Sequence, residues 1–297
     1  MLPDPSYALY RAGSAVSRAL PGPIVAPFTG GTAKLAAQLM RGRRSMVARH
    51  QQRVRPELRG AALDRAVDEV FESYTAYWIE SFRLPGTSPE ALDAGMVTEG
   101  FELLRDAYDA GDGVIVAMPH LGAWEWAAFW LTSVQQVPVT TVVEPVEPPE
   151  LADWFVGLRE RLGMEIVPLG PDSGTRVARA LADKRVISLL CDRDITGGGV
   201  EVEFFGERTT LPAGPATLAL RSGAPLLPAT CYFDGDSHLG VVLDPIDTTR
   251  QGKLRADVAR VTQDLARALE ELIRRRPTQW HLLQPNWPSD RAAEADG

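Results

Sequence analysis

From residue 113 onward the chain alternates short apolar runs with longer amphipathic stretches, and this order constrains the fold more than any other feature of the sequence. The runs have the length of buried strands, and several of the stretches between them repeat apolar positions at helical spacing. The predicted strands are 113–118, 139–143, 166–167, 186–191, 226–233 and 239–243, and the predicted helices between or after them are 126–131, 149–162, 175–183, 215–222 and 254–274. This order indicates an α/β fold with a largely parallel central sheet flanked by helices.

The first of these strands ends at Pro119, and the residues that follow carry a histidine and a carboxylate into the next helix. Two residues five apart on one helix lie ~140° apart around its axis. His120 and Glu125 can therefore meet only if His120 lies on the turn before the helix, which Gly122 would permit. A carboxylate bonded to one imidazole nitrogen makes the other nitrogen a better base. The alternative is a turn histidine with satisfied hydrogen bonds and an exposed glutamate.

A second carboxylate, Asp192, directly follows the predicted strand 186–191. In open α/β sheets ligands bind beyond the carboxyl ends of the strands. We therefore expect His120 and Asp192 to lie at the same edge of the sheet. The alternative for Asp192 is a structural ion pair with its neighbour Arg193.

Three stretches of the chain resemble motifs of a known family. They are His120-Leu121-Gly122-Ala123-Trp124-Glu125, the segment from Cys191 to Ala216, and Trp280-His281-Leu282-Leu283-Gln284-Pro285-Asn286-Trp287. The first resembles the H-x-x-x-x-[D/E] box of glycerolipid and lipid A acyltransferases. All three in this order, across roughly residues 60 to 290, resemble the lipid A acyltransferase superfamily and its actinobacterial branch, the phosphatidylinositol mannoside acyltransferases.

The resemblance implies roles for three catalytic residues. His120 would be the general base, and Glu125 would be the acid of the box. Asp192 stands where this branch usually has glutamate, which is thought to orient the histidine as its charge partner. Aspartate is one methylene shorter, so the sequence leaves open whether Asp192 or Glu125 orients His120.

The resemblance also implies three residues around the acceptor sugar, namely Glu144, Arg159 and His281. Glu144 is followed by Pro145, where the branch usually has arginine. Taken without the resemblance, Arg159 would be a surface residue and His281 a histidine with satisfied hydrogen bonds. The apolar stretch 126–131 would line the groove for the acyl chain or belong to the core.

By this resemblance the protein is an acyl-CoA-dependent O-acyltransferase of glycolipid biosynthesis. It would move a long-chain acyl group to a hydroxyl of a glycolipid, above all the mannose of phosphatidylinositol mannoside, with neither metal nor cofactor. A direct general-base route agrees with the residues, because the chain lacks a G-x-S-x-G elbow and neither Cys191 nor Cys231 lies in an activating setting. The nearest alternative is the same reaction on another acceptor, such as a lysophospholipid.

Two further classes of protein remain as alternatives. A metal hydrolase could use His120, Asp192 and Asp194, but the chain has no H-x-x-x-H or H-x-H ligand pair. A lipid-binding protein without catalytic activity would bind acyl-CoA or glycolipid and transfer nothing.

Charge is distributed unevenly along the chain. The formal net charge of −8 argues against a general nucleic-acid binder. Residues 34–59, by contrast, hold eight basic residues and one acid, a balance of +7 that favours contact with an anionic membrane surface. The alternative is a solvated helical face. We expect an N-terminal helical, membrane-contacting segment over residues 1–60, with helices at 7–20 and 32–53, followed by one α/β acyltransferase domain over 61–297.

The sequence has no run of 18 or more apolar residues and no basic region of the kind that begins a signal peptide. We therefore expect neither a transmembrane helix nor a signal peptide, and a peripheral protein on the cytoplasmic face of the plasma membrane. Abundant Arg, Ala, Gly and Pro fit an actinobacterial source.

Overall fold

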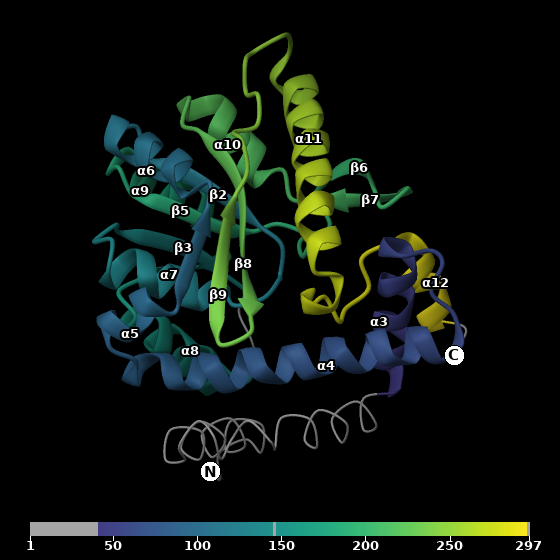
Figure 1. Ribbon diagram of the computed structural model, residues 1–297. Helices are drawn as coiled ribbons and strands as arrows, with labels where there is room; N and C mark the ends of the chain where they lie inside the picture. The colour runs from purple at the N-terminus through teal and green to yellow at the C-terminus, as the bar shows by residue number, and fades with distance from the viewer. Residues whose placement is uncertain (1–40, 145–146, 296–297) are drawn as a thin grey trace.

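The computed structural model describes residues 41–144 and 147–295, and its centre is a seven-stranded sheet (Figure 1). The strand order is β1-β9-β8-β2-β5-β3-β4, and neighbours are parallel except β8 and β9. The strands are β1 (Met96–Glu99), β2 (Val114–Met118), β3 (Val139–Val143), β4 (Glu165–Pro168), β5 (Val186–Leu190), β8 (Leu226–Asp234) and β9 (Ser237–Val242). The predicted α/β fold with a largely parallel sheet is confirmed.

Helices connect most of these strands. They are α3 (Arg41–Val54), α4 (Gly60–Arg83), α5 (Pro89–Ala94), α6 (Phe101–Ala110), α7 (Trp124–Ser133), α8 (Pro149–Arg161), α9 (Ser173–Ala182), α10 (Gly214–Ser222), α11 (Leu254–Arg275) and α12 (Pro288–Ala295), with short 3-10 helices η1 (Leu84–Gly86) and η2 (Pro277–Gln279). A separate hairpin of β6 (Val200–Phe204) and β7 (Glu207–Leu211) packs beside α11. Its two turn residues, Phe205 and Gly206, both have positive φ, as tight hairpins require.

Strand β2 shows why the sheet has helices on both faces. All five of its residues are buried, the pattern of a strand inside a parallel sheet. Ile115 and Ala117 belong to a core cluster with residues of α9, α10 and α11. Val114, Val116 and Met118 point to the other face and join a cluster with residues of α5, α6 and α7. The period of two along the strand thus divides the core into two layers.

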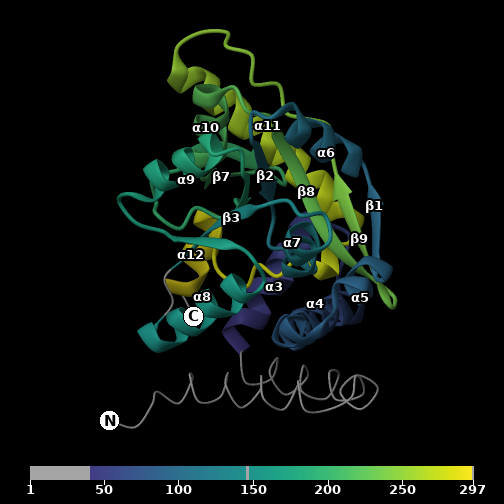
Figure 2. The ribbon, with the colours of Figure 1, turned by 90° about the vertical axis from the view of Figure 1, so that its left-hand side faces the viewer.

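Helix α4 crosses the lower end of the sheet in Figure 1, and α8 lies beside it in Figure 2. With 24 residues, α4 is about 36 Å long. Trp78 and Phe82 of α4 pack against Phe155 of α8 in one apolar cluster. The two helices therefore lie at the end of the sheet where strand β2 leads into the turn at His120.

Helix α3 is the described part of the predicted helix 32–53. The predicted helix 7–20 and residues 32–40 fall outside the described residues. Val47 of α3 packs against Val67 and Phe71 of α4 and against Leu283 near the C-terminus. In residues 41–144 and 147–295, none of the helices is both long enough and apolar enough to span a bilayer.

Candidate active site

The turn after β2 is held by the segment that follows α11. Leu121 forms an antiparallel bridge with Trp280. The backbone N–H of His281 donates to the carbonyl of His120 at 2.7 Å, and the N–H of Ala123 donates to the carbonyl of Cys231 at 2.7 Å. The first and third motifs of the sequence therefore lie side by side, and the turn has hydrogen bonds on both sides.

Gly122 is required at the centre of this turn. Its φ is +63°, in the left-handed region that glycine tolerates best. A Cβ atom at this position would lie 2.1 Å from the carbonyl oxygen of Cys231. Any larger residue would therefore have to push the turn away from strand β8.

We expect Gly122→Ala to lower the free energy of unfolding by about 3 kcal/mol or more, because it combines left-handed strain with a backbone clash. Gly206→Ala is the matched control, since Gly206 has a φ of +75° and no atom within 4 Å of an added Cβ. That variant should lose only the cost of the left-handed conformation, about 1–2 kcal/mol. Equal losses in thermal unfolding of the two variants would contradict the close approach at Gly122.

His120 and Asp192 meet at the carboxyl ends of β2 and β5, at the edge expected from their positions after the two strands. The Nδ1 atom of His120 lies 2.6 Å from Oδ1 of Asp192. The backbone N–H of His120 also donates to Oδ2 of Asp192 at 3.1 Å. Aspartate is therefore long enough to reach the imidazole, and Arg193 is not its ion-pair partner.

Asp192 is fully buried and is held as a carboxylate. Burial raises its pKa, but the positive charge of His120 and hydrogen bonds from His120 and Trp280 lower the pKa more, so it lies below the ordinary value. The indole N–H of Trp280 donates to Oδ2 at 2.8 Å. Because a carboxylate only accepts, Nδ1 of His120 carries the hydrogen and Nε2 is the basic nitrogen. This hydrogen assignment follows from the bonding pattern.

Glu125 lies in a different group of contacts. Its Oε1 accepts hydrogen bonds from the hydroxyl of Tyr77 at 2.7 Å and from the guanidinium of Arg159 at 2.9 Å. Burial raises the pKa of Glu125, although Arg159 and Tyr77 oppose the shift. Among the described residues, Oε2 of Glu125 and Nε of Arg159 are buried without a hydrogen-bond partner. The carboxylate that contacts His120 is therefore Asp192, and Glu125 holds Arg159.

His281 is buried beside the turn at His120. Its Nε2 lies 2.8 Å from the hydroxyl of Ser73 on α4, and its ring lies 5.6 Å from that of Tyr74 and 5.5 Å from that of Tyr77. Burial, with the nearby charge of His120, lowers the pKa of His281 to about 3. His281 is therefore a neutral imidazole at neutral pH.

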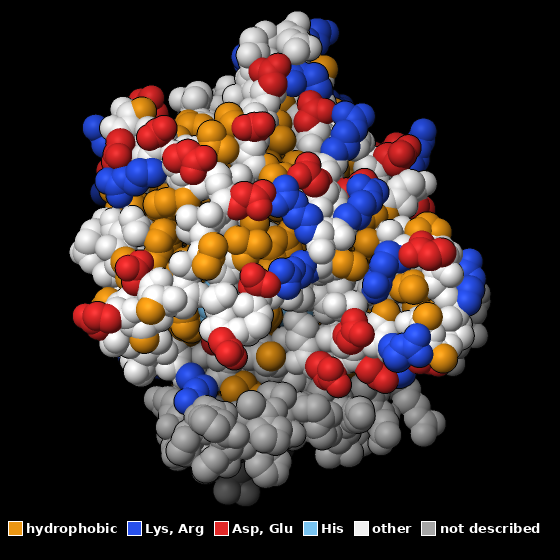
Figure 3. All heavy atoms as spheres, in the orientation of Figure 1, with side chains coloured by type: hydrophobic (Ala, Val, Ile, Leu, Met, Phe, Trp, Pro, Cys, Tyr) orange, Lys and Arg blue, Asp and Glu red, His pale blue; other side chains and the backbone are white. Residues whose placement is uncertain are grey.

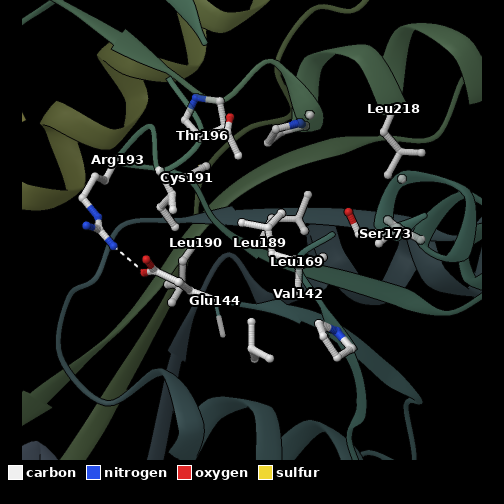
Figure 4. Close-up of a pocket in the computed structure, with 18 of the residues that line it drawn as sticks. Val142, Glu144, Leu169, Ser173, Leu189, Leu190, Cys191, Arg193, Thr196 and Leu218 are labelled. Atoms are coloured by element: carbon white, nitrogen blue, oxygen red, sulfur yellow. Dashed lines mark hydrogen bonds and ion pairs between the residues drawn. The ribbon is translucent and has the colours of Figure 1, made fainter. Parts of the chain in front are cut away.

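Glu144 lies after β3 and pairs with Arg193 across 2.6 Å (Figure 4). Its side chain is exposed, unlike those of Glu125 and Asp192. The ion pair therefore lies on a more open part of the cavity wall than the residues around His120.

A cavity of about 1480 Å³ joins most of these residues. Its wall near the turn after β2 includes His120, Trp124, Arg159 and His281, with aromatic side chains from α4. A second part is lined by apolar side chains of β3, β5, α9 and α10 and by Leu169, which follows β4. Val142, Leu169, Leu189 and Leu218 are labelled in Figure 4, and Val177 and Leu181 of α9 also line this part. The cavity also reaches Asp112, which precedes β2. It therefore extends along the sheet, over a strand length of roughly 16 Å.

The apolar stretch 126–131 belongs to the core and not to this cavity. It lies in α7, where Trp130 donates to Asp93 at 3.0 Å and Trp126 stacks on His238 with ring centroids 3.9 Å apart. Of the residues of α7, only Trp124 lines the large cavity. The stretch therefore does not line the large cavity, and its second interpretation, as core, agrees with this packing.

Three residues at the site could not be assigned a role from the sequence. Trp280 was visible only as part of a motif, and Tyr77 lies seven residues after Val70, a spacing typical of core positions on a helix. The side chain of Asn286 donates to the backbone carbonyl of Asp192 at 2.9 Å. In the part of the chain that the structure describes, no group of three or more His, Cys, Asp or Glu side chains is arranged to hold a metal ion.

The site therefore combines a buried carboxylate–histidine pair with a long, partly apolar cavity on an α/β scaffold. Residues 2–289 match the family described as bacterial lipid A biosynthesis acyltransferase. The chain belongs to this family.

Within it, the chain is similar to proteins named phosphatidylinositol mannoside acyltransferase. It is 38% identical over 295 residues to the one from Mycolicibacterium smegmatis (strain ATCC 700084 / mc(2)155), covering 96% of this chain and 92% of the relative. It is 40% identical over 226 residues to the one from Mycobacterium tuberculosis (strain ATCC 25618 / H37Rv), covering 74% of this chain and 69% of that protein.

Proposed function

We propose that the protein transfers a long-chain acyl group from acyl-CoA to a mannose hydroxyl of phosphatidylinositol mannoside, with His120 as the general base. The observation that carries the proposal is that His120, paired with the buried Asp192, lines a cavity of about 1480 Å³, in a chain whose relatives are named for this acceptor. The family supports acyl transfer as the reaction, and the names of the relatives support the glycolipid.

The chemistry needs only a base and a stabilised oxyanion. Nε2 of His120 takes the proton of the mannose hydroxyl as its oxygen attacks the thioester carbonyl. The C–S bond then breaks, coenzyme A leaves as a thiolate or takes the proton from His120, and an ester remains. Asp192 stabilises the imidazolium that forms, because its carboxylate is 2.6 Å from Nδ1.

Glu144, Arg159 and His281 would bind the acceptor sugar, as the family resemblance implies, and all three line the cavity. Glu125 and Arg159 each have a buried polar atom without a partner in the described residues. Buried polar atoms are costly unless they are hydrogen-bonded. A hydroxyl group of an acceptor sugar would supply the missing hydrogen bond of Arg159, which lines the cavity.

The apolar part of the cavity supports a long alkyl chain as the group transferred. Side chains such as Val142, Leu181 and Leu218 line it, and burying a methylene among apolar side chains contributes about 0.8 kcal/mol. The thioester carbonyl would lie at the His120 end and the chain would extend along the sheet.

The experiment is acyl transfer by the purified protein, with labelled long-chain acyl-CoA and three parallel acceptors: phosphatidylinositol mannoside, a lysophospholipid, and none. Mass spectrometry should find one added acyl group on the mannoside, on the sugar and not on the glycerol. Transfer to the lysophospholipid alone would refute the acceptor. Transfer from another acyl thioester but not from acyl-CoA would refute the donor.

We also propose that the basic N-terminal segment contacts an anionic membrane surface on the cytoplasmic side. Arg43 of α3 is exposed, whereas Arg44 and Arg53 form ion pairs with Asp68 and Glu207. Docking therefore depends on the basic residues that remain exposed. The face with α11 toward the viewer mixes acidic and basic side chains (Figure 3).

Reversing the charge at Arg43 tests this docking. Arg43→Glu should weaken binding to vesicles rich in anionic lipid by roughly 1–2 kcal/mol at low salt, and the effect should fade as salt is added. Arg255→Glu is a control with the same charge change, at an exposed position in the first turn of α11. Equal affinities of the two variants in co-sedimentation would refute docking through α3.

A further inference from the structure

A second buried histidine, His50 on α3, lies against the segment that supports the catalytic pair. His50 is 1% exposed. Nδ1 lies 2.9 Å from the carbonyl oxygen of Leu282, and Nε2 lies 3.2 Å from Oδ2 of Asp290. A carbonyl and a carboxylate oxygen both accept, so the ring satisfies both only with a hydrogen on each nitrogen.

Asp290 is the centre of this cluster. It is fully buried, and its Oδ2 also accepts from the backbone N–H groups of Asn286 and Trp287 at 3.1 and 3.2 Å. Arg53 of α3 forms an ion pair with its Oδ1 at 2.8 Å. Burial raises the pKa of Asp290, but the hydrogen bond from His50 and the two backbone N–H groups outweigh it and hold the pKa well below the ordinary range. Asp290 is therefore a carboxylate that ties α3 to residues 286–290.

The same segment carries two of the hydrogen bonds to Asp192. The His50 ring lies 5.5 Å from the Trp280 ring and 5.3 Å from the Trp287 ring. Trp280 donates its indole N–H to Oδ2 of Asp192, and Asn286 donates its amide to the backbone carbonyl of Asp192. His50 thus contacts Trp280 directly and is linked to Asn286 through Asp290.

We propose that His50 is a positioning residue for acyl transfer, which holds the segment 280–290 so that Trp280 and Asn286 fix Asp192 against His120. The inference rests on the proposed function, because acyl transfer is the reaction whose rate His50 would affect. It makes α3 part of the catalytic apparatus, in addition to any contact with a membrane. A residue that merely stabilised the fold would not act through Asp192.

Two variants at this position separate the contacts. His50→Gln alters the hydrogen bonds of this position to both Leu282 and Asp290. His50→Asn keeps an amide donor near the position of Nδ1, close to the carbonyl of Leu282, and loses the contact with Asp290. The matched control is His238→Gln, because His238 is also buried and its Nε2 lies 2.7 Å from Oε2 of Glu80. Melting temperatures are measured for all variants, and activity is assayed well below the lowest of them.

The deciding measurement is a double-mutant cycle with Asp192→Asn. We expect His50→Gln to lower kcat at least tenfold in the wild-type background, with little change in KM. In the Asp192→Asn background the same substitution should lower kcat by a further factor of less than two. His238→Gln should change kcat by the same factor in both backgrounds. Equal factors for His50→Gln in the two backgrounds would overturn the proposal.

A measurement that needs no acyl transfer makes this test independent of the proposed function. The indole ¹H–¹⁵N resonance of Trp280 reports its hydrogen bond to Asp192. The chemical shift of this resonance should change in His50→Gln and His50→Asn and stay the same in His238→Gln. A protein that transfers no acyl group would refute the proposed function, while an unmoved Trp280 resonance in both His50 variants would refute the positioning role.

Discussion

His120→Ala is expected to lower kcat for acyl transfer by about 10²- to 10⁴-fold, the range that a positioned general base contributes. The backbone bonds of the turn, from His281 to His120 and from His120 to Asp192, remain in this variant. Asp192 loses one of its hydrogen bonds, however, which costs about 1–3 kcal/mol at a buried acceptor. The loss of rate should therefore exceed any loss of stability.

His120→Asn is the sharper form of the same experiment. Its amide can offer a donor to Asp192 near the place of Nδ1, but asparagine has no basic nitrogen. We expect a melting temperature close to that of the wild type and a kcat as low as that of His120→Ala. A folded His120→Asn protein with near-normal turnover would exclude His120 as the base.

Asp192→Asn and Glu125→Gln should give different results, because the two carboxylates have different partners. Asp192→Asn removes the counter-charge 2.6 Å from Nδ1 of His120. We expect kcat to fall by about 10²- to 10⁴-fold, as when the carboxylate of a catalytic triad is replaced by an amide. The acid limb of the pH–rate profile should move to lower pH, because the imidazolium has lost its stabilising charge.

Glu125→Gln should leave the acid limb of the pH–rate profile unchanged, since Glu125 is hydrogen-bonded to Tyr77 and Arg159 and not to His120. It should instead lower stability by about 3–5 kcal/mol, because Arg159 becomes a buried charge without its partner. Any loss of activity should depend on the acceptor. A shift of the acid limb in Glu125→Gln, with none in Asp192→Asn, would reverse the roles assigned to the two residues.

The edge of the sheet that carries the site could be predicted from the sequence because it depends on local chemistry. Pro119 ends β2, and Gly122 permits the turn after it. Apolar runs that stop directly before His120 and Asp192 put both residues at the carboxyl ends of strands. Since β2 and β5 are neighbours in parallel register, the two residues meet.

The partners of the carboxylates could not be predicted, because they depend on how distant helices pack. Tyr77 is buried on α4, seven residues after the buried Val70, and nothing in its spacing marks its hydroxyl as a donor to Glu125. Trp280 reaches Asp192 across 88 residues of sequence. The β6–β7 hairpin, by contrast, has a local signal in the alternation of Val200–Phe204 and the turn at Phe205 and Gly206.

The bridge between Leu121 and Trp280 has a consequence for the order of events as the chain folds. The strands β2 and β5 and the turn at His120 are synthesised well before Trp280, and His50 lies 232 residues before its partner Leu282. Closing such long loops is slow, because chain entropy is lost before the contacts form. A nascent chain that already has its sheet still lacks the donor that holds Asp192, and we expect activity only after the last segment has docked.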